Sequence, residues 1–139
     1  MDWEAELVIQ MRTTAFALRD ASEARDHIGC WGVGNDLSDR WWQSAGGGQW
    51  LRSKSFPGFA PHNITAASPA ADFCLDRRIC CWLNDELVQD ATLSEYLYPP
   101  ELLLAALASS LDSGLCWVGE LSSEEPRFGD RCAIQLVQG

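Results

Sequence analysis

The 139-residue sequence predicts a single α+β domain over residues 1–139, with a mixed or antiparallel sheet and two helices packed on one face. Three observations lead to this prediction. Apolar, β-branched segments of strand length recur along the chain, and two segments carry the start and stop signals of helices. Strands and helices are interspersed, and no internal repeat or change in composition marks a domain boundary.

Residues 7–18 are expected to form the first strand, because their β-branched side chains favour extended structure. The alternative is one long helix over residues 3–27, but such a helix would leave Ile9 and Phe16 on the side opposite its apolar stripe. The β-branched residues that favour the strand are Val8, Ile9, Thr13 and Thr14.

A short helix over residues 21–28 is predicted next. Asp20 can cap its N-terminus, and Glu23 stands three residues later, as in a capping box. Gly29 follows the last helical residue, where glycine commonly ends a helix.

The next segment, residues 27–55, holds four of the seven tryptophans and six of the eleven glycines. Residues 27–39 are interpreted as a helix exit and turn, because Gly32 and Gly34 interrupt regular structure. Residues 40–54 are expected to form a hairpin of two short strands, with the three glycines 46–48 in the connecting loop.

Residues 56–71 are predicted to be a loop, since three prolines remove backbone donors there. A strand is expected within residues 72–83, most clearly over 78–83, followed by a turn at 84–86 and a short return strand at 87–89. The prolines of the loop are Pro57, Pro61 and Pro69.

The clearest helix begins at Pro99 or Pro100, because proline is favoured at the first helical position. It is expected to continue to Leu111 and to stop at Gly114. Its nearly all-apolar surface requires cover on most sides, and a second subunit is one way to supply it. The predicted core stripe is Leu103, Leu104, Leu107 and Leu111.

The last elements are expected to be a closing hairpin of residues 115–121 and 131–137. The predicted loop between them, residues 122–130, is acidic and contains a proline and a glycine. Such residues favour a turn between two apolar strands.

The net charge of −10 argues against nucleic-acid binding, because an acidic chain repels phosphates. The N-terminal residues show no signal peptide, and no apolar run has the length of a membrane span. We therefore expect a cytoplasmic protein that contacts neither nucleic acid nor membrane.

The sequence predicts no metal, no cofactor and no catalytic residue. The six cysteines include no C-x-x-C pair, and His27 and Cys30 alone would leave a metal site two ligands short. No nucleotide-binding glycine motif and no G-x-S-x-G motif occurs. A thiol nucleophile at Cys30, or a role for His62, stays open, while Asp36 and Asp39 are interpreted as capping residues.

The most unusual feature is the basic, aromatic segment of residues 40–54, whose net charge of +3 contrasts with the acidic chain. Indole faces beside guanidinium groups can stack a flat ligand and pair an anionic group. The sequence thus favours a non-catalytic homo-oligomer that binds a small organic ligand with a polar or anionic group. The predicted pocket residues are Trp41, Trp42, Trp50, Arg40 and Arg52.

The alternative function is an acidic protein-interaction module, such as an immunity or antitoxin-like inhibitor of a basic partner. Residues 71–139 carry twelve acidic and four basic residues, a net charge of −8. A surface of this sign can steer a basic partner toward it.

Overall fold

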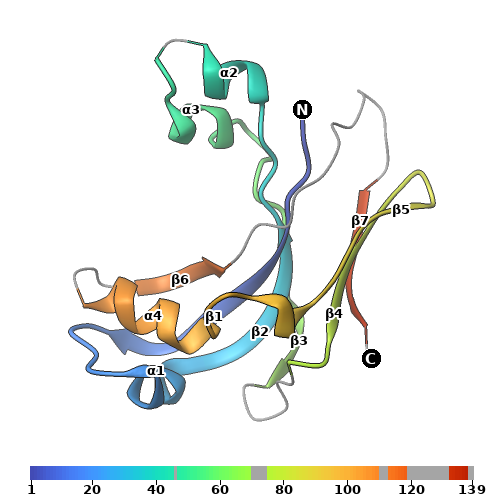
Figure 1. The fold of residues 1–139 in the computed structure, drawn as a ribbon. Helices are drawn as coiled ribbons and strands as arrows, with labels where there is room; N and C mark the ends of the chain where they lie inside the picture. Colours follow the sequence, from blue (N-terminus) through green and yellow to red (C-terminus); the bar gives the residue numbers. More distant parts are fainter. Residues whose placement is uncertain (46, 70–74, 110–112, 119–131, 138–139) are drawn as a thin grey trace.

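The computed structural model describes residues 1–45, 47–69, 75–109, 113–118 and 132–137. Two antiparallel sheets organise this part of the chain (Figure 1). The first has four strands in the order β3-β2-β1-β6, and the second has three in the order β5-β4-β7. The antiparallel α+β class is confirmed. The strands nevertheless form two sheets, where the sequence predicted one.

The four-stranded sheet consists of β1 (Ala5–Ala15), β2 (Ile28–Asn35), β3 (His62–Pro69) and β6 (Ser113–Val118). The three-stranded sheet consists of β4 (Arg78–Leu83), β5 (Glu86–Thr92) and β7 (Cys132–Val137). The helices are α1 (Ala21–His27), α2 (Arg40–Ser44), α3 (Trp50–Lys54) and α4 (Pro100–Ala108), with a 3₁₀ turn η2 at Leu93–Glu95.

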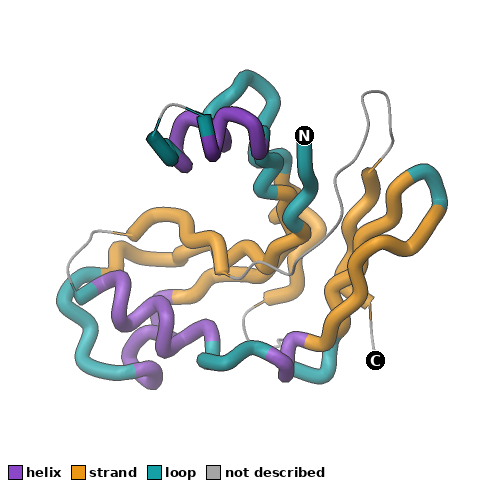
Figure 2. Tube along the Cα trace, turned by 45° about the horizontal axis from the view of Figure 1, so that its top comes forward, coloured by secondary structure: helices purple, strands orange, loops and turns teal. Residues whose placement is uncertain are grey.

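The helices fall into two pairs (Figures 1 and 2). The helix α1 packs against α4, and the two contact the four-stranded sheet through β1 and β6. The short helices α2 and α3 contact each other and lie near the N-terminus. The packing of two helices on one face of a sheet stays a prediction.

The apolar core joins the two sheets and the α1–α4 pair. Apolar side chains of β1 and β2 pack there with side chains of β4 and α4, so that folding removes them from water. The core contains the buried indoles of Trp3 and Trp31 and the buried aliphatic side chains Leu7, Ile9, Ile79, Leu93 and Leu104.

Three elements agree with their local signals. The strand β1 confirms extended structure against the long-helix alternative. In α1, the side chain of Asp20 accepts a hydrogen bond from the N–H of Glu23, as expected of an N-cap. Asn84 and Asp85 connect β4 to β5 with φ of 49° and 69°, a left-handed conformation that Asn and Asp tolerate in tight hairpins.

The prediction of a helix exit and turn over residues 27–39 is wrong. Residues 28–35 form β2, an inner strand between β1 and β3. A Cβ at Gly32 would lie 2.5 Å from the backbone oxygen of Asn63 in β3, so glycine permits the close approach of the two strands. The neighbouring Trp31 is buried in the core.

The predicted hairpin of residues 40–54 is also wrong, because this segment forms α2 and α3. Asp39 caps α2 by accepting a hydrogen bond from the N–H of Trp42. Gly47 and Gly48, both with positive φ, lie between the two helices. The interpretation of Asp39 as a capping residue is thus confirmed.

The predicted loop of residues 56–71 contains β3, which pairs with β2. Pro69 stands at the end of this strand, where the missing N–H costs least. The loop prediction is therefore wrong for residues 62–69, because this segment pairs with β2, a strand distant in sequence.

The helix α4 starts at Pro100 as predicted but ends at Ala108, and Gly114 lies in β6. Its buried face includes Leu104 and Ala108, whereas Leu107 is 40% exposed. Ala105 and Ala108 face the core, and α4 packs against α1, so the predicted stripe holds only in part. The predicted stripe residue Leu111 lies outside the described residues.

The closing hairpin does not form. The strand β6 pairs with β1, and β7 pairs with β4, so the two segments belong to different sheets. The predicted loop of residues 122–130 lies outside the described part of the chain.

Candidate functional site

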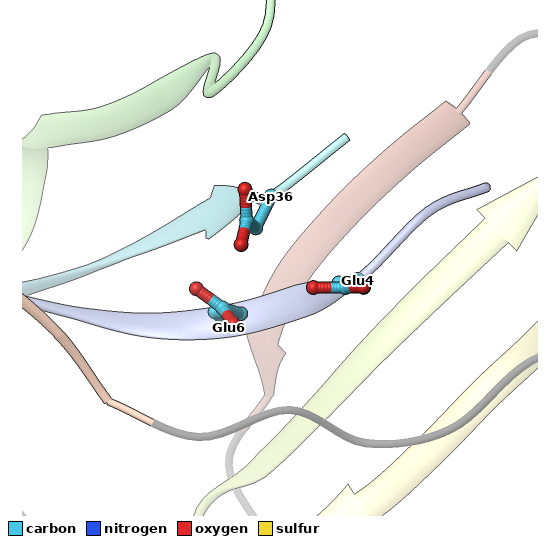
Figure 3. Close-up of side chains that lie close together, drawn as sticks. All are labelled: Glu4, Glu6 and Asp36. Carbon is cyan, nitrogen blue, oxygen red and sulfur yellow. The ribbon is translucent and has the colours of Figure 1, made fainter. Parts of the chain in front are cut away.

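Three carboxylates converge where β1 begins and β2 ends. Glu4 and Glu6 are two residues apart in extended chain, so their side chains leave the same face. The N–H of Asp36 donates to the carbonyl of Glu4 at 2.9 Å, which brings Asp36 beside them. One carboxylate oxygen from each residue lies within 4.8 Å of the other two (Figure 3).

Two of these carboxylates are buried in the domain. Glu4 is 1% exposed and Glu6 is 6% exposed, while Asp36 is half-buried. A buried carboxylate is costly unless a positive charge or hydrogen bonds compensate it. The cluster therefore requires cationic partners, and the structure provides two from α2 and α3.

The first partner is Lys54, the last residue of α3. Its Nζ donates to Glu4 Oε2 at 2.6 Å, to Ser38 Oγ at 3.1 Å and to a carboxylate oxygen of Asp36. The N–H of Asp39 donates to the carbonyl of Ser53 at 3.0 Å, which ties α3 to the beginning of α2. The path of the chain between β2 and α3 thus delivers the ammonium group to the carboxylates.

The second partner is Arg40, the first residue of α2. Its Nη2 lies 2.6 Å from Glu4 Oε1 and 2.5 Å from Asp2 Oδ2. Ser38 Oγ also donates to Glu4 Oε1 at 3.0 Å. Both oxygens of Glu4 are therefore held by donors, which orients this carboxylate toward the centre of the cluster.

The environment changes the pKa values of the cluster. Burial would raise the pKa of Glu4, but the hydrogen bonds and charges of Lys54, Ser38 and Arg40 outweigh it, so the pKa lies below its usual value. Burial raises the pKa of Asp36, and Lys54 offsets only part of this effect. Burial alone would lower the pKa of Lys54, but the hydrogen bonds and charges of Asp36 and Glu4 outweigh burial. The pKa of Lys54 is therefore above its usual value, and the ammonium stays charged.

The donor set of the cluster consists of carboxylate oxygens. Hard divalent cations such as Mg²⁺, Mn²⁺ and Ca²⁺ prefer such ligands. The separation of these oxygens allows Glu4, Glu6 and Asp36 to reach one ion together. The three residues therefore fit a divalent cation, and Lys54, which bonds to Glu4 and Asp36, adds a further positive group beside it.

A family comparison decides the relationship of this chain to known proteins. The model of the fumarylacetoacetate (FAA) hydrolase C-terminal family matches residues 1–117. The chain belongs to the FAA hydrolase family. The matched residues include all three carboxylates, Lys54 and Arg40.

Curated relatives support the assignment to the FAA hydrolase family. The human mitochondrial oxaloacetate tautomerase FAHD2A is 33% identical over 109 residues, which are 76% of this chain and 34% of the relative. Fumarylacetoacetate hydrolase domain-containing protein 2 of Pongo abelii is 34% identical, with the same coverage. The chain thus spans about a third of the length of these relatives.

Solved structures of other proteins share the fold. The fumarylacetoacetate hydrolase of Exiguobacterium antarcticum has a TM-score of 0.88 at 22% identity, with 97% of this chain and 52% of that chain covered. The 2-hydroxyhepta-2,4-diene-1,7-dioate isomerase of Mycobacterium marinum has a TM-score of 0.86 at 23% identity, with 96% and 53% covered.

Membership of the FAA hydrolase family corrects the predicted function. The matching family is named for a hydrolase and the human relative is named as a tautomerase, so the prediction of a non-catalytic binding protein is wrong. The same finding displaces the alternative of an immunity or antitoxin-like module. No helix among the described residues has the length and apolar character to cross a membrane. The cytoplasmic location stays a prediction, since the human relative is named as mitochondrial.

Of the five residues predicted to bind a ligand, the structure brings together Trp41, Trp42 and Arg52. Arg40 belongs to the carboxylate cluster of this FAA hydrolase chain. The guanidinium of Arg52 lies 3.5 Å from the centre of the Trp42 ring, and Trp42 meets Trp41 edge to face. Trp41 and Trp50 are 65% and 60% exposed. The ligand-binding role of these residues stays a prediction.

The residues left open as nucleophile or base have partners of their own. The thiol of Cys30 donates to Gln10 Oε1 at 3.0 Å. His27 Nδ1 lies 2.9 Å from Thr13 Oγ1, and His62 Nδ1 lies 3.1 Å from the carbonyl of Ala60.

Sequence reasoning missed the carboxylate cluster, having predicted no metal site and interpreted Asp36 as a cap. One local signal was present: Glu4 and Glu6 alternate with apolar residues where an otherwise apolar strand begins. Charged residues are rare on the buried face of a strand, so this pattern could have indicated a site.

Proposed function

We propose that this chain carries the cation-binding part of an FAA hydrolase-type enzyme that acts on small oxo-dicarboxylic acids. The observation that carries the proposal is the convergence of Glu4, Glu6 and Asp36 beside the charged groups of Lys54 and Arg40. A bound divalent cation would supply Lewis-acid polarisation of a substrate carbonyl.

The names of the relatives indicate the substrate class. Oxaloacetate is an oxo-dicarboxylate, and 2-hydroxyhepta-2,4-diene-1,7-dioate is a dicarboxylate with an enol group. Both can move a proton between carbon and the oxygen of an oxo or enol group. Keto–enol tautomerisation is therefore the reaction class that we propose for this chain.

The residues of the chain would divide the work between them. Glu4, Glu6 and Asp36 would hold the cation, and Arg40 would keep Glu4 in its orientation. Lys54 stays charged and lies against Glu4 and Asp36, so it would stabilise negative charge that develops on a substrate oxygen. Burial of the cluster strengthens these interactions, because little water competes with them.

The aromatic residues of α2 and α3 remain part of the proposal. Arg40 is the first residue of α2 and pairs with Glu4 of the carboxylate cluster. Trp41 and Trp42 follow Arg40 in the same short helix. We propose that Trp41, Trp42, Trp50 and Arg52 bind the distal part of the ligand. We also propose a homo-oligomer, supported by the exposed apolar side chains Leu102 and Leu107 of α4.

Cation binding is tested by calorimetric titration of the purified chain with Mn²⁺. We expect binding by the wild type and its loss in Glu6→Gln. The matched control is Glu86→Gln, an exposed glutamate at the beginning of β5, which should bind as the wild type does. Equal binding by the wild type and Glu6→Gln would contradict the proposed cation site.

The reaction is tested with oxaloacetate, by following the ultraviolet absorbance of its enol. Wild-type protein should speed the decay of the enol in the presence of Mn²⁺, and chelation should remove the effect until Mn²⁺ is restored. Full acceleration after chelation, or in Glu6→Gln, would refute the proposed role of the carboxylates.

A further inference from the structure

A buried glutamine of the three-stranded sheet contacts the strand that carries the glutamates. Gln89 in β5 is 5% exposed. Its Oε1 accepts from the N–H of Ala5 at 3.1 Å, and its Nε2 donates to the carbonyl of Ala5 at 3.1 Å. Ala5 is fully buried and stands between Glu4 and Glu6.

This contact lies at a position of β1 where, among the described residues, only one side is paired with a strand of the four-stranded sheet. On one side, β1 pairs with β2, where Ala5 lies opposite Asn35. On the other side, the pairing with β6 begins at Leu7. The side chain of Gln89 therefore bonds to the backbone N–H and carbonyl of Ala5, two residues before Leu7, where the pairing with β6 begins. A neighbouring strand would bond to the same two backbone groups.

A second side-chain amide holds the same stretch from the other side. The N–H of Glu4 donates to Oδ1 of Asn35 at 2.9 Å, and the carbonyl of Glu4 accepts from Asp36. The backbone around the glutamates is thus held by Asn35 and Asp36 toward β2 and by Gln89 toward the second sheet. A strand held on both sides cannot easily turn about its own axis.

We infer that Gln89 is a positioning residue, which sets the directions of the Glu4 and Glu6 carboxylates by its paired hydrogen bonds to Ala5. Successive side chains of a strand point to opposite faces, so a rotation at Ala5 would move both neighbouring carboxylates together. Groups that orient metal ligands typically change metal affinity about 10–100-fold when removed. The cation part of this inference rests on the proposed function.

The test compares Gln89→Met with a destabilised variant elsewhere in the core. Methionine has a similar length but cannot bond to Ala5. The control is Leu93→Ala, which removes a buried side chain of η2. Thermal melts check that both variants are folded at the measuring temperature. The readouts are Mn²⁺ affinity by calorimetry and, without metal, the carboxyl ¹³C resonances of Glu4 and Glu6.

Gln89→Met should weaken Mn²⁺ binding about 10–100-fold and shift both carboxyl resonances. Leu93→Ala should retain the wild-type affinity and resonances. Wild-type affinity and unshifted resonances in Gln89→Met would overturn the inference, and so would equal losses in both variants.

Two further results separate the inference from the proposed function. If the wild type bound no Mn²⁺, the proposed function would fail, and the carboxyl resonances would still decide the positioning role. If Gln89→Met did not fold, Gln89→Glu would replace it. In its ionised form, at a pH above the pKa of its carboxyl group, this variant keeps the acceptor for the Ala5 N–H but loses the donor to the Ala5 carbonyl. It should shift the same resonances, and wild-type resonances in it would overturn the inference.

Discussion

Arg40, the first residue of α2, and Glu4, just before β1, form a close ion pair, with Arg40 Nη2 2.6 Å from Glu4 Oε1. The same guanidinium bonds to Asp2 through Nε at 2.7 Å. One side chain of α2 thus compensates two carboxylates that are almost fully buried. This relationship couples the position of α2 to the carboxylate cluster.

Arg40→Met is expected to lower the free energy of unfolding by about 3 kcal/mol, because Asp2 and Glu4 would lose their buried partner. Chemical denaturation measures the change. The control is Arg19→Met, whose exposed pair with Glu23 should contribute little to stability, because water screens it. Similar losses in the two variants would show that the Arg40 pairs contribute no more than surface pairs.

Gly32→Ala is expected to destabilise the four-stranded sheet by about 2–3 kcal/mol, since the new methyl group would overlap the backbone of Asn63. Gly47→Ala is the control, because its Cβ would meet open space. That variant should cost only the strain of a positive φ, about 1 kcal/mol. Thermal denaturation compares them, and an equal or smaller cost at Gly32 would disprove close packing of β2 and β3.

Tyr96 is expected to make stability fall at alkaline pH. Burial, followed by the nearby charge of Glu6, raises the pKa of Tyr96 from 10.0 to about 12. The folded state therefore holds the phenol proton longer than the unfolded state does. Its stabilising contribution is fully present below pH 10 and is lost as the pH rises toward 12, by about 2 kcal/mol.

The alkaline prediction is checked by denaturation between pH 9 and 12 of Tyr96→Phe and the wild type. The loss of stability should be about 2 kcal/mol smaller in the variant. In Tyr98→Phe, Tyr96 is the remaining tyrosine, so an absorbance titration reads its pKa directly. A midpoint near 10 would contradict the burial effect.

Trp41→Ala and Trp50→Ala should each cost less than about 1 kcal/mol in stability, because both indoles are largely exposed. If they bind the distal part of the ligand, each variant should raise KM for an oxo-dicarboxylic substrate while kcat changes little. Leu51→Ala, an exposed apolar residue of α3, is the control. Unchanged KM in both tryptophan variants would dismiss the predicted aromatic site.

Local signals predicted several elements correctly. The β-branched residues of β1, the Asp20 cap of α1 and the proline at the beginning of α4 each act through contacts within a few residues. The tight turn at Asn84 and Asp85 belongs to the same group. Such features depend on backbone preferences and neighbouring side chains, which are visible in any short stretch of sequence.

Other elements depended on partners far along the chain. Glycine in β2 was interpreted as a turn signal, but Gly32 serves the approach of β3. The two apolar segments at the C-terminal end were expected to pair with each other, yet β6 joins β1 and β7 joins β4. Strand pairing is a competition among all segments of the chain, and periodicity alone does not identify the partner.

The candidate site shows the same division. The sequence by itself determined that a strand follows Glu4 and Glu6 and that the segment around Arg40 and Lys54 is basic. Only the tertiary structure decided that this segment lies over the glutamates, and that Asp36 and Gln89 reach the same strand. The physical reason is strand register: the pairing of β1 with β2 places Asp36 beside Glu4, and the path through α2 and α3 brings both cations to the carboxylates.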